Sequence, residues 1–113
     1  MSIFARSTPG IDAATAAQRA REGALILDVR ENDEWQAGHI PGATHIPLGE
    51  LPTRASELPC DRPIIVACRS GARSAKATKH LVGMGIDATN LDGGTQGWHA
   101  SGQPLEPRDG RVA

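Results

Sequence analysis

The chain of 113 residues is close to the commonest size of one folded domain and too short for two packed domains. Its 12 basic and 13 acidic residues nearly cancel, which excludes a nucleic-acid-binding protein that relies on bulk positive charge and leaves no acidic disordered tract. Aromatic residues make up only 3%, so aliphatic side chains and closely packed helices must build the core.

Patterns of helix and strand alternate along the chain, between a flexible arm at residues 1–10 and a flexible tail at residues 106–113. Alanines spaced three and four apart behind a capping Asp12 indicate the first helix. Two continuous apolar runs are typical of strands that are buried on both faces. In chain order we predict a helix at 13–20, a strand at 24–29, a short helix at 33–37 capped by Asn32, a strand at 44–46, a helix at 48–57 interrupted by Pro52, a strand at 63–68, a helix from about Ser74 to 82, a strand at 86–91 and a short helix around Trp98.

Strands that alternate with helices predict an α/β domain over residues 11–105, with three layers: a mostly parallel sheet and helices on both of its faces. The longest apolar run, residues 64–68, is far too short to span a membrane. The first seven residues lack the apolar stretch and the cleavage pattern of a secretory signal, and two cysteines in such a chain indicate reduced thiols. We therefore expect a cytoplasmic protein that binds neither membranes nor nucleic acid.

One stretch of the chain departs from the neutral balance. Residues 63–86 contain no Asp or Glu, but they contain the four cations Arg69, Arg73, Lys76 and Lys79. A cationic stretch centred on a cysteine indicates a small anionic substrate. For the two lysines, a solvated helix face is an equally good explanation, whereas the two arginines fall in a predicted turn.

Cys68 ends the predicted strand 63–68, at the sheet edge where open parallel sheets bind their ligands. The connection to the next helix reads Arg69-Ser70-Gly71-Ala72-Arg73. A thiol there faces helical N–H groups that have no intrahelical acceptor, and Gly71 allows the curl that turns successive N–H groups inward.

Lowering the pKa of a thiol by about two units takes about 2.7 kcal/mol. A helix dipole supplies only ~0.3–1 kcal/mol, so N–H···S contacts and the two arginines must provide the rest. We predict that Cys68 is a reactive thiolate; the alternative is a small apolar residue that ends a buried strand.

The length of the loop bears on its chemistry. Four residues separate Cys68 from Arg73, whereas phosphatases that use a cysteine at such a loop have five between the two residues. The shorter loop loses one inward N–H group and about 3.5 Å of contour, so it suits a single terminal sulfur better than a phosphate group. No residue pattern favours a cysteine-protease pairing, because Ala67 and not a histidine precedes Cys68.

Motifs spread over residues 11–105 resemble those of the rhodanese family. The first signature is matched by Asp28-Val29-Arg30-Glu31, Glu34-Trp35, Gly38-His39-Ile40-Pro41-Gly42-Ala43 and Ile46-Pro47-Leu48; the active-site loop by Cys68-Arg69-Ser70-Gly71-Ala72-Arg73-Ser74; and the closing signature by Gly93-Gly94 with Trp98. The ordered motifs and the loop together make chance agreement a poor explanation.

The resemblance implies a single-domain sulfurtransferase with a five-stranded, mostly parallel sheet and no cofactor. Cys68 would take the outer sulfur of an anionic donor such as thiosulfate, and the persulfide would pass it to cyanide or to a thiol, including a thiol of a protein acceptor. Arg73 and the amides of the loop, from Arg69 through Ser70, Gly71 and Ala72, would bind the donor, with Arg69 steering it. Two alternatives remain: a non-catalytic rhodanese-like interaction or sulfur-carrier module, and a phosphatase or arsenate reductase that uses the same loop.

Other residues have supporting roles in this prediction. Ser74 belongs to the loop, and two roles are open for Asp28: a bidentate pair that orients Arg73, or a cap on a neighbouring turn. Trp35 and Trp98 are predicted to cover the core.

Cys60 lies in a predicted turn, either as a plain surface thiol or as a partner that resolves a Cys68 persulfide as a disulfide. His39 and His45 lack the cysteine partners of a zinc site, so no metal site is predicted.

Overall fold

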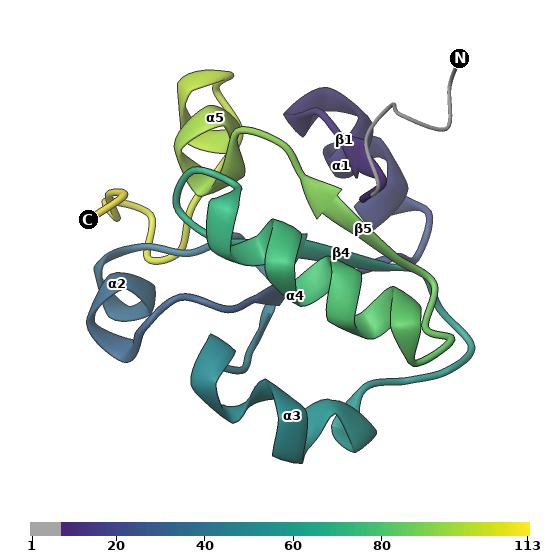
Figure 1. Cartoon of the computed structure of the whole chain (residues 1–113). Helices are drawn as coiled ribbons and strands as arrows, with labels where there is room; N and C mark the ends of the chain where they lie inside the picture. Colours follow the sequence, from purple (N-terminus) through teal and green to yellow (C-terminus); the bar gives the residue numbers. More distant parts are fainter. Residues whose placement is uncertain (1–7) are drawn as a thin grey trace.

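The computed structural model describes residues 8–113, in which a five-stranded sheet lies between layers of helices (Figure 1). Residues 1–7, most of the predicted arm, lie outside the described part of the chain. The elements are β1 (Gly10–Ile11), α1 (Ala13–Arg21), β2 (Leu25–Asp28), α2 (Asn32–Ala37), β3 (Thr44–His45), the 3₁₀ turn η2 (Leu48–Glu50), α3 (Leu51–Arg54), the 3₁₀ turn η3 (Ala55–Glu57), β4 (Ile64–Ala67), α4 (Ala72–Gly83), β5 (Ala88–Leu91) and α5 (Gly94–Ala100).

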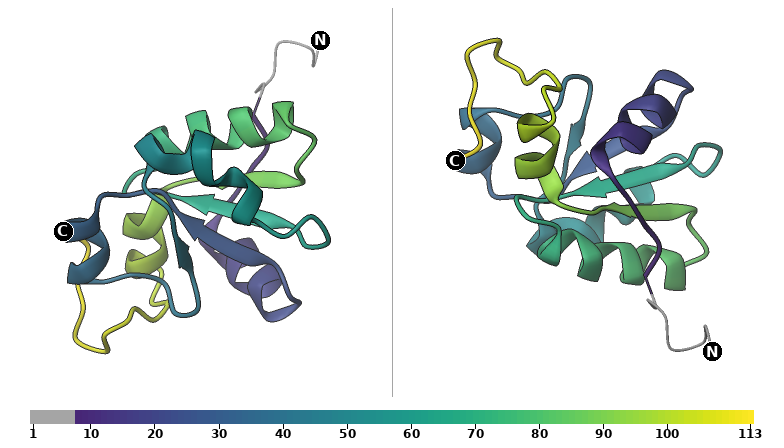
Figure 2. Two further views of the ribbon diagram at one scale, coloured as in Figure 1. Left: turned by 90° about the horizontal axis from the view of Figure 1, so that it is seen from below. Right: turned by 90° about the horizontal axis from the view of Figure 1, so that it is seen from above.

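The sheet has the strand order β1-β5-β4-β2-β3, and every pair of neighbouring strands is parallel. Helices α3 and α4 cover one face, and α1 and α5 cover the other (Figure 2). The three-layer α/β prediction is therefore confirmed. In this topology β2 and β4 are neighbours with Asp28 opposite Ala67, so the loops that follow both strands leave from the same edge of the sheet.

Strand β4 determines the side of the sheet toward which the Cys68 side chain points. Its four residues are at most 1% exposed, as expected for a continuous apolar run between two helical layers. Ile65 packs in the cluster beneath α1 and α5, whereas Val66 and Cys68 pack in the cluster beneath α3 and α4. Because side chains alternate along a strand, Cys68 is directed toward α4.

Several boundaries differ from the prediction. The helix predicted at 48–57 is a short helix between two 3₁₀ turns, with Pro52 in its first turn and not interrupting it. Three other differences have a clear physical reason. Gly10 and Ile11 form β1 on β5, a strand of two residues that is too short to show a sequence period. Helix α4 begins at Ala72 because Gly71, at φ 107°, turns the chain in the left-handed region that favours glycine. Helix α2 is capped by Glu31, which forms a capping box with Glu34.

Residues 106–113, predicted as a tail, lie against α2 and the loop that follows β4. Glu106 exchanges two backbone hydrogen bonds with His39, at 2.9 and 2.7 Å, and the N–H of Arg111 donates to the carbonyl of Ala37 at 3.0 Å. A Cβ atom at Gly38 would lie 2.5 Å from the carbonyl oxygen of Arg111. These contacts involve backbone atoms, which leave no pattern of residue types in the sequence.

The helices of residues 8–113 are short. The longest, α4, has 12 residues, and no described helix is both long and apolar enough to cross a lipid bilayer. The structure therefore gives no sign of a membrane-spanning helix within this range.

The close approach at Gly38 predicts that Gly38→Ala destabilises the fold by about 1–3 kcal/mol, because the added methyl group overlaps the backbone of residue 111. Urea unfolding measures the loss, and amide hydrogen exchange at Arg111 reports release of the C-terminal segment. Gly49→Ala is the matched control, since nothing lies within 4 Å of a Cβ at that position. Equal stability of the two variants would contradict the prediction.

Candidate active site

The Cys68 thiol lies between the end of β4 and the first turn of α4. The residue is only 1% exposed, and the N–H of Gly71 and the hydroxyl of Ser74 donate to its Sγ at 3.1 and 3.3 Å. Burial by itself raises the pKa of the Cys68 thiol, but the hydrogen bonds from the Ser74 hydroxyl and from backbone N–H groups of the loop outweigh it. The net pKa is lowered, which favours the thiolate.

The loop backbone is held from behind by the first turn of α5. The N–H groups of Thr95 and Gln96 donate to the carbonyls of Cys68 and Arg69 at 2.8 and 3.0 Å. A Cβ atom at Gly94 would overlap both of these carbonyl oxygens, so only glycine allows the two segments to come this close. The Gly93-Gly94 motif therefore lets the first turn of α5 hold the loop backbone in place through these two hydrogen bonds.

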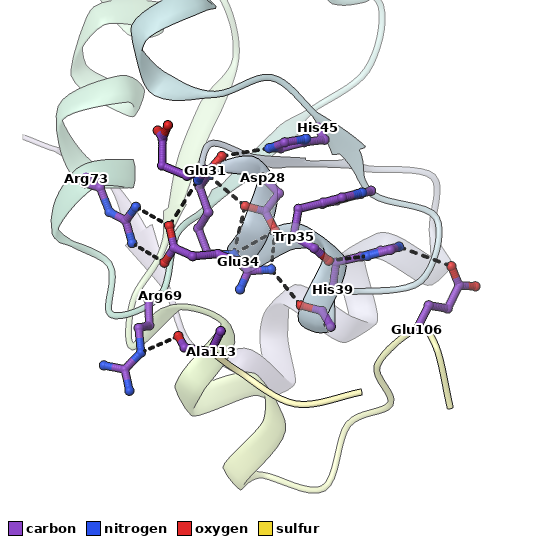
Figure 3. Close-up of polar contacts among 12 residues, drawn as sticks. Asp28, Glu31, Glu34, Trp35, His39, His45, Arg69, Arg73, Glu106 and Ala113 are labelled. Carbon is purple, nitrogen blue, oxygen red and sulfur yellow. Dashed lines mark hydrogen bonds and ion pairs between the residues drawn. The ribbon is translucent and has the colours of Figure 1, made fainter. Parts of the chain in front are cut away.

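Arg73 and Glu34 form a bidentate ion pair between α4 and α2, in which the two Nη atoms lie 2.7 and 2.9 Å from the carboxylate oxygens (Figure 3). The side-chain hydrogen bonds from Arg73 lower the pKa of Glu34 to about 2, although burial opposes them. The same hydrogen bonds raise the pKa of Arg73. The planar fork of the guanidinium is thus occupied by Glu34 and fixes the start of α4 against α2.

Asp28 does not reach Arg73, and of the two predicted roles the structure shows the local one. Its carboxylate accepts the backbone N–H of Arg30 at 2.9 Å and pairs with the buried guanidinium of Arg30, with Nη2 at 2.8 Å from Oδ2. Arg30 also donates to the carbonyl of Gly38 at 2.8 Å. The hydrogen bonds between Asp28 and Arg30, which is two residues further on, close this turn. The partner of Arg73 is therefore Glu34 and not Asp28.

Trp35 lies between two histidine rings rather than over the core. The rings of His39 and His45 stack on it with centroids 3.6 and 4.8 Å away (Figure 3). His45 Nε2 lies 2.7 Å from the carbonyl of Arg30, so the stack ties α2 to the turn after β2. Trp98 is 4% exposed and belongs to the core, as predicted.

The remaining loop residues face outward. Arg69, Ser70 and Ala72 are exposed, and Arg69 Nε donates to the backbone carbonyl of Ala113 at 2.9 Å (Figure 3). No group of three or more His, Cys, Asp or Glu side chains that could hold a metal ion occurs within residues 8–113. The structure therefore brings the predicted thiol, Gly71 and Ser74 into contact and leaves Arg69 at the surface.

Cys60 lies in the exposed loop that enters β4, whereas Cys68 follows the other end of the strand. The four residues of β4 span about 13 Å, well beyond the ~7 Å limit for two Cα atoms joined by a disulfide. The surface-thiol interpretation of Cys60 therefore fits the structure, and the resolving disulfide does not.

Comparisons with known proteins agree on one family. The model of the rhodanese-like domain matches residues 12–101. A sulfurtransferase from Allochromatium vinosum is 38% identical over 88% of this chain and 96% of its own length, and a thiosulfate sulfurtransferase from Pseudomonas putida is 36% identical over 83% and 86%. The crystal structure of a rhodanese-related protein from Thermoplasma volcanium superposes with a TM-score of 0.82 at 33% identity, over 86% of this chain and 96% of the other.

The chain therefore belongs to the rhodanese-like domain family. Relatives that carry the name sulfurtransferase support the same class of activity for this protein.

The ion pair between Glu34 and Arg73 predicts a pH-dependent contribution to stability. Because the pKa of Glu34 in the fold is about 2, below its ordinary value of 4.5, the pair stabilises the fold fully above about pH 5 and is lost as the pH falls through 2. After allowance for solvent screening, since Arg73 is 36% exposed, this is worth roughly 1 kcal/mol.

The substitution Glu34→Gln should remove this contribution, so its urea-unfolding free energy should fall less between pH 5 and pH 2 than that of the wild type. Glu57→Gln is the control, because its pair with Arg54 lies at the surface and is screened by water. Parallel pH profiles for the wild type and Glu34→Gln would show that the ion pair adds no stability.

Proposed function

We propose that this protein is a thiosulfate-type sulfurtransferase, which moves a sulfane sulfur from an anionic donor to a thiophilic acceptor through a persulfide on Cys68. The observation that carries the proposal is the buried thiol held by the Gly71 N–H and the Ser74 hydroxyl at the start of α4. A thiolate stabilised in this way is the nucleophile that sulfur transfer requires. The similarity to a thiosulfate sulfurtransferase supports thiosulfate as the donor to test first.

In the first step the Cys68 thiolate attacks the outer sulfur of thiosulfate. A bond forms between the two sulfur atoms while the S–S bond of the donor breaks, and its electron pair leaves with sulfite. The product is a Cys68 persulfide anion, and charge is conserved because thiosulfate and sulfite are both dianions. The N–H groups of Ala72 and Arg73, which open α4 and have no intrahelical acceptor, can stabilise the new terminal sulfur.

In the second step an acceptor removes the outer sulfur. Cyanide attacks it to give thiocyanate, or a thiolate attacks it to give a new persulfide, and in both cases the Cys68 thiolate is restored. No external oxidant or reductant is needed, because the sulfur that leaves the donor carries its oxidation state to the acceptor.

The two arginines of the loop have different roles in this proposal. Both Nη atoms of Arg73 are bound by Glu34, so Arg73 positions the loop and contributes positive charge behind it. Arg69 is bound through Nε alone, which leaves its two Nη groups for the oxygens of the donor. This differs from the expectation that Arg73 binds the donor and Arg69 only steers it.

Three features favour sulfur transfer over the other activities considered. The loop between Cys68 and Arg73 is one residue shorter than a phosphatase loop, and the thiol at 1% exposure is reached by a slender terminal sulfur more readily than by a phosphate ester. A non-catalytic interaction module has no need for a thiol with a lowered pKa. A cytoplasmic location, where thiols stay reduced, suits this chemistry.

Thiosulfate should add the mass of one sulfur atom to the protein, and peptide mapping should place it on Cys68. Added cyanide should remove this sulfur and yield thiocyanate. Cys68→Ser should abolish both steps, because a hydroxyl cannot carry a stable persulfide, whereas Cys60→Ser should keep both. Aryl phosphate hydrolysis, measured in parallel, should stay at the level of the Cys68→Ser variant.

Sulfur on Cys60, or thiocyanate formation by Cys68→Ser, would disprove the assignment of the nucleophile. Aryl phosphate hydrolysis that depends on Cys68, in a protein that takes no sulfur from thiosulfate or another persulfide donor, would favour the phosphatase alternative.

The assignment of the arginines predicts that Arg69→Gln raises the KM for thiosulfate about tenfold, with a smaller change in kcat, because charge-assisted hydrogen bonds to the donor are lost. Arg62→Gln is a matched control. Its exposed guanidinium also donates through Nε to a backbone carbonyl, that of Gly23 at 2.8 Å, but it lies at the opposite edge of the sheet. An unchanged KM for Arg69→Gln would remove Arg69 from the donor site.

A further inference from the structure

The outward face of α4 carries two neighbouring lysines. Lys76 and Lys79 are both exposed, lie three residues apart on one side of the helix and make no ion pair with any residue in 8–113. The buried side of α4 is formed by Ser74, Ala77, Thr78 and Leu81. The lysines therefore take no part in holding the helix to the sheet.

No described carboxylate on a neighbouring element forms an ion pair with either lysine. Residues 63–86 contain no Asp or Glu. On the same face of the sheet, Glu50 and Glu57 are both engaged by Arg54, at 2.8 and 3.0 Å. Glu34 is paired with the fork of Arg73, and the charge of Glu31 also acts on Arg73. The ammonium groups of Lys76 and Lys79 are therefore available to the carboxylates of a partner.

The stability of the helix does not explain the placement of these cations. The helix dipole favours acidic residues in the first turn and basic residues in the last turn, but α4 has no acidic residue in its first turn and carries Arg73 there. An acid three or four residues from a lysine would add a stabilising pair, and α4 contains none. The two lysines therefore supply helix propensity and solubility to α4 but no stabilising ion pair.

The same helix carries exposed apolar side chains. Val82 and Met84, at 44% and 52% exposure, are the exposed large hydrophobic residues found in the described part of the chain, and both lie at the end of α4. Twelve helical residues span about 18 Å, and a protein interface of ordinary size covers about 800 Å² on each partner. One partner can therefore contact both lysines and this apolar end while it covers the catalytic loop.

Cys68 lies at the N-terminal end of α4, beneath the buried side to which Ser74 belongs. Lys76 and Lys79 stand about 6 and 10 Å along the axis from the first residue of α4, whose N-terminal turn encloses the thiol. Because Cys68 is only 1% exposed, an acceptor thiol must stand on a narrow projecting segment to reach the persulfide. The body of such an acceptor then rests on the first turns of α4.

We propose that the outward face of α4, formed by Lys76, Lys79, Val82 and Met84, is the docking surface for an acidic protein that accepts the sulfur on a projecting cysteine thiolate. The inference rests on the proposed function. In the transfer, the acceptor thiolate attacks the outer sulfur of the Cys68 persulfide, the bond between the two sulfurs of the persulfide breaks, and the electron pair returns to Cys68.

The test uses two synthetic acceptor peptides, one with a cysteine flanked by Asp and Glu and one with the same cysteine flanked by Lys. The protein is first loaded with thiosulfate, and cyanide measures its basal turnover. At about 20 mM salt the acidic peptide should remove sulfur roughly tenfold faster than the basic one. At about 0.5 M salt the two rates, corrected for the thiolate fraction of each peptide, should converge.

The double variant Lys76→Glu/Lys79→Glu should lose or reverse this preference while its turnover with cyanide stays unchanged. Arg19→Glu/Arg21→Glu is the matched control: it changes the net charge equally on α1, on the opposite face of the sheet, and should keep the preference for the acidic peptide. A thiol-free acidic peptide should compete for the docking surface. In the wild type it should slow sulfur transfer to the acidic acceptor peptide at low salt and have no effect at high salt.

Equal rates for the two peptides at low salt, or the same loss of preference in both double variants, would overturn the docking surface while sulfur transfer to cyanide stands. Failure of the protein to form thiocyanate at all would instead refute the proposed function, so the two failures are distinguishable.

Discussion

The hydrogen bonds that Gly71 N–H and the Ser74 hydroxyl donate to Cys68 Sγ are the interaction on which the site depends. Burial disfavours a thiolate, and here donors at the start of α4 outweigh that penalty. The N–H of Gly71 precedes the helix and has no intrahelical acceptor, so its hydrogen atom is available to the sulfur. The Ser74 hydroxyl adds a second donor, and together the two favour the charged form of the buried sulfur.

The rest of the fold keeps this contact in place from three sides. Strand β4 directs the thiol toward α4, and the first turn of α5 binds the carbonyls of Cys68 and Arg69 from behind. On the third side Glu34 fixes Arg73 through a bidentate pair, and the stack of Trp35 with two histidines holds α2 in position. The loop is thus constrained before a donor binds, which limits the reorganisation that catalysis requires.

The sequence predicted the parts of the site that are local in the chain. The loop from Cys68 to Ser74 is contiguous, and its strand and helix have clear periods, so both the thiol and its cradle could be placed. The partner of Arg73 could not, because Glu34 lies 39 residues away and meets it only where β2 and β4 are neighbours. The sequence leaves open whether Asp28 pairs with Arg73 or caps a neighbouring turn, and in the structure its carboxylate binds Arg30 within such a turn. The contacts of residues 106–113 with α2 were not predicted because those with His39 and Ala37 are largely made by backbone atoms, and Val112 is an isolated apolar residue with no period.

The most direct test of the central claim is a titration of the Cys68 thiol in the Cys60→Ser protein, followed by the ultraviolet absorbance of the thiolate. The pKa should lie below the ordinary value of a cysteine thiol, and Ser74→Ala should raise it because a hydrogen bond to the charged sulfur is lost. Ser101→Ala, which removes a hydroxyl bound to the carbonyl of Trp98, should leave it unchanged. A Cys68 pKa at or above the ordinary value, or one that does not respond to Ser74→Ala, would contradict the account.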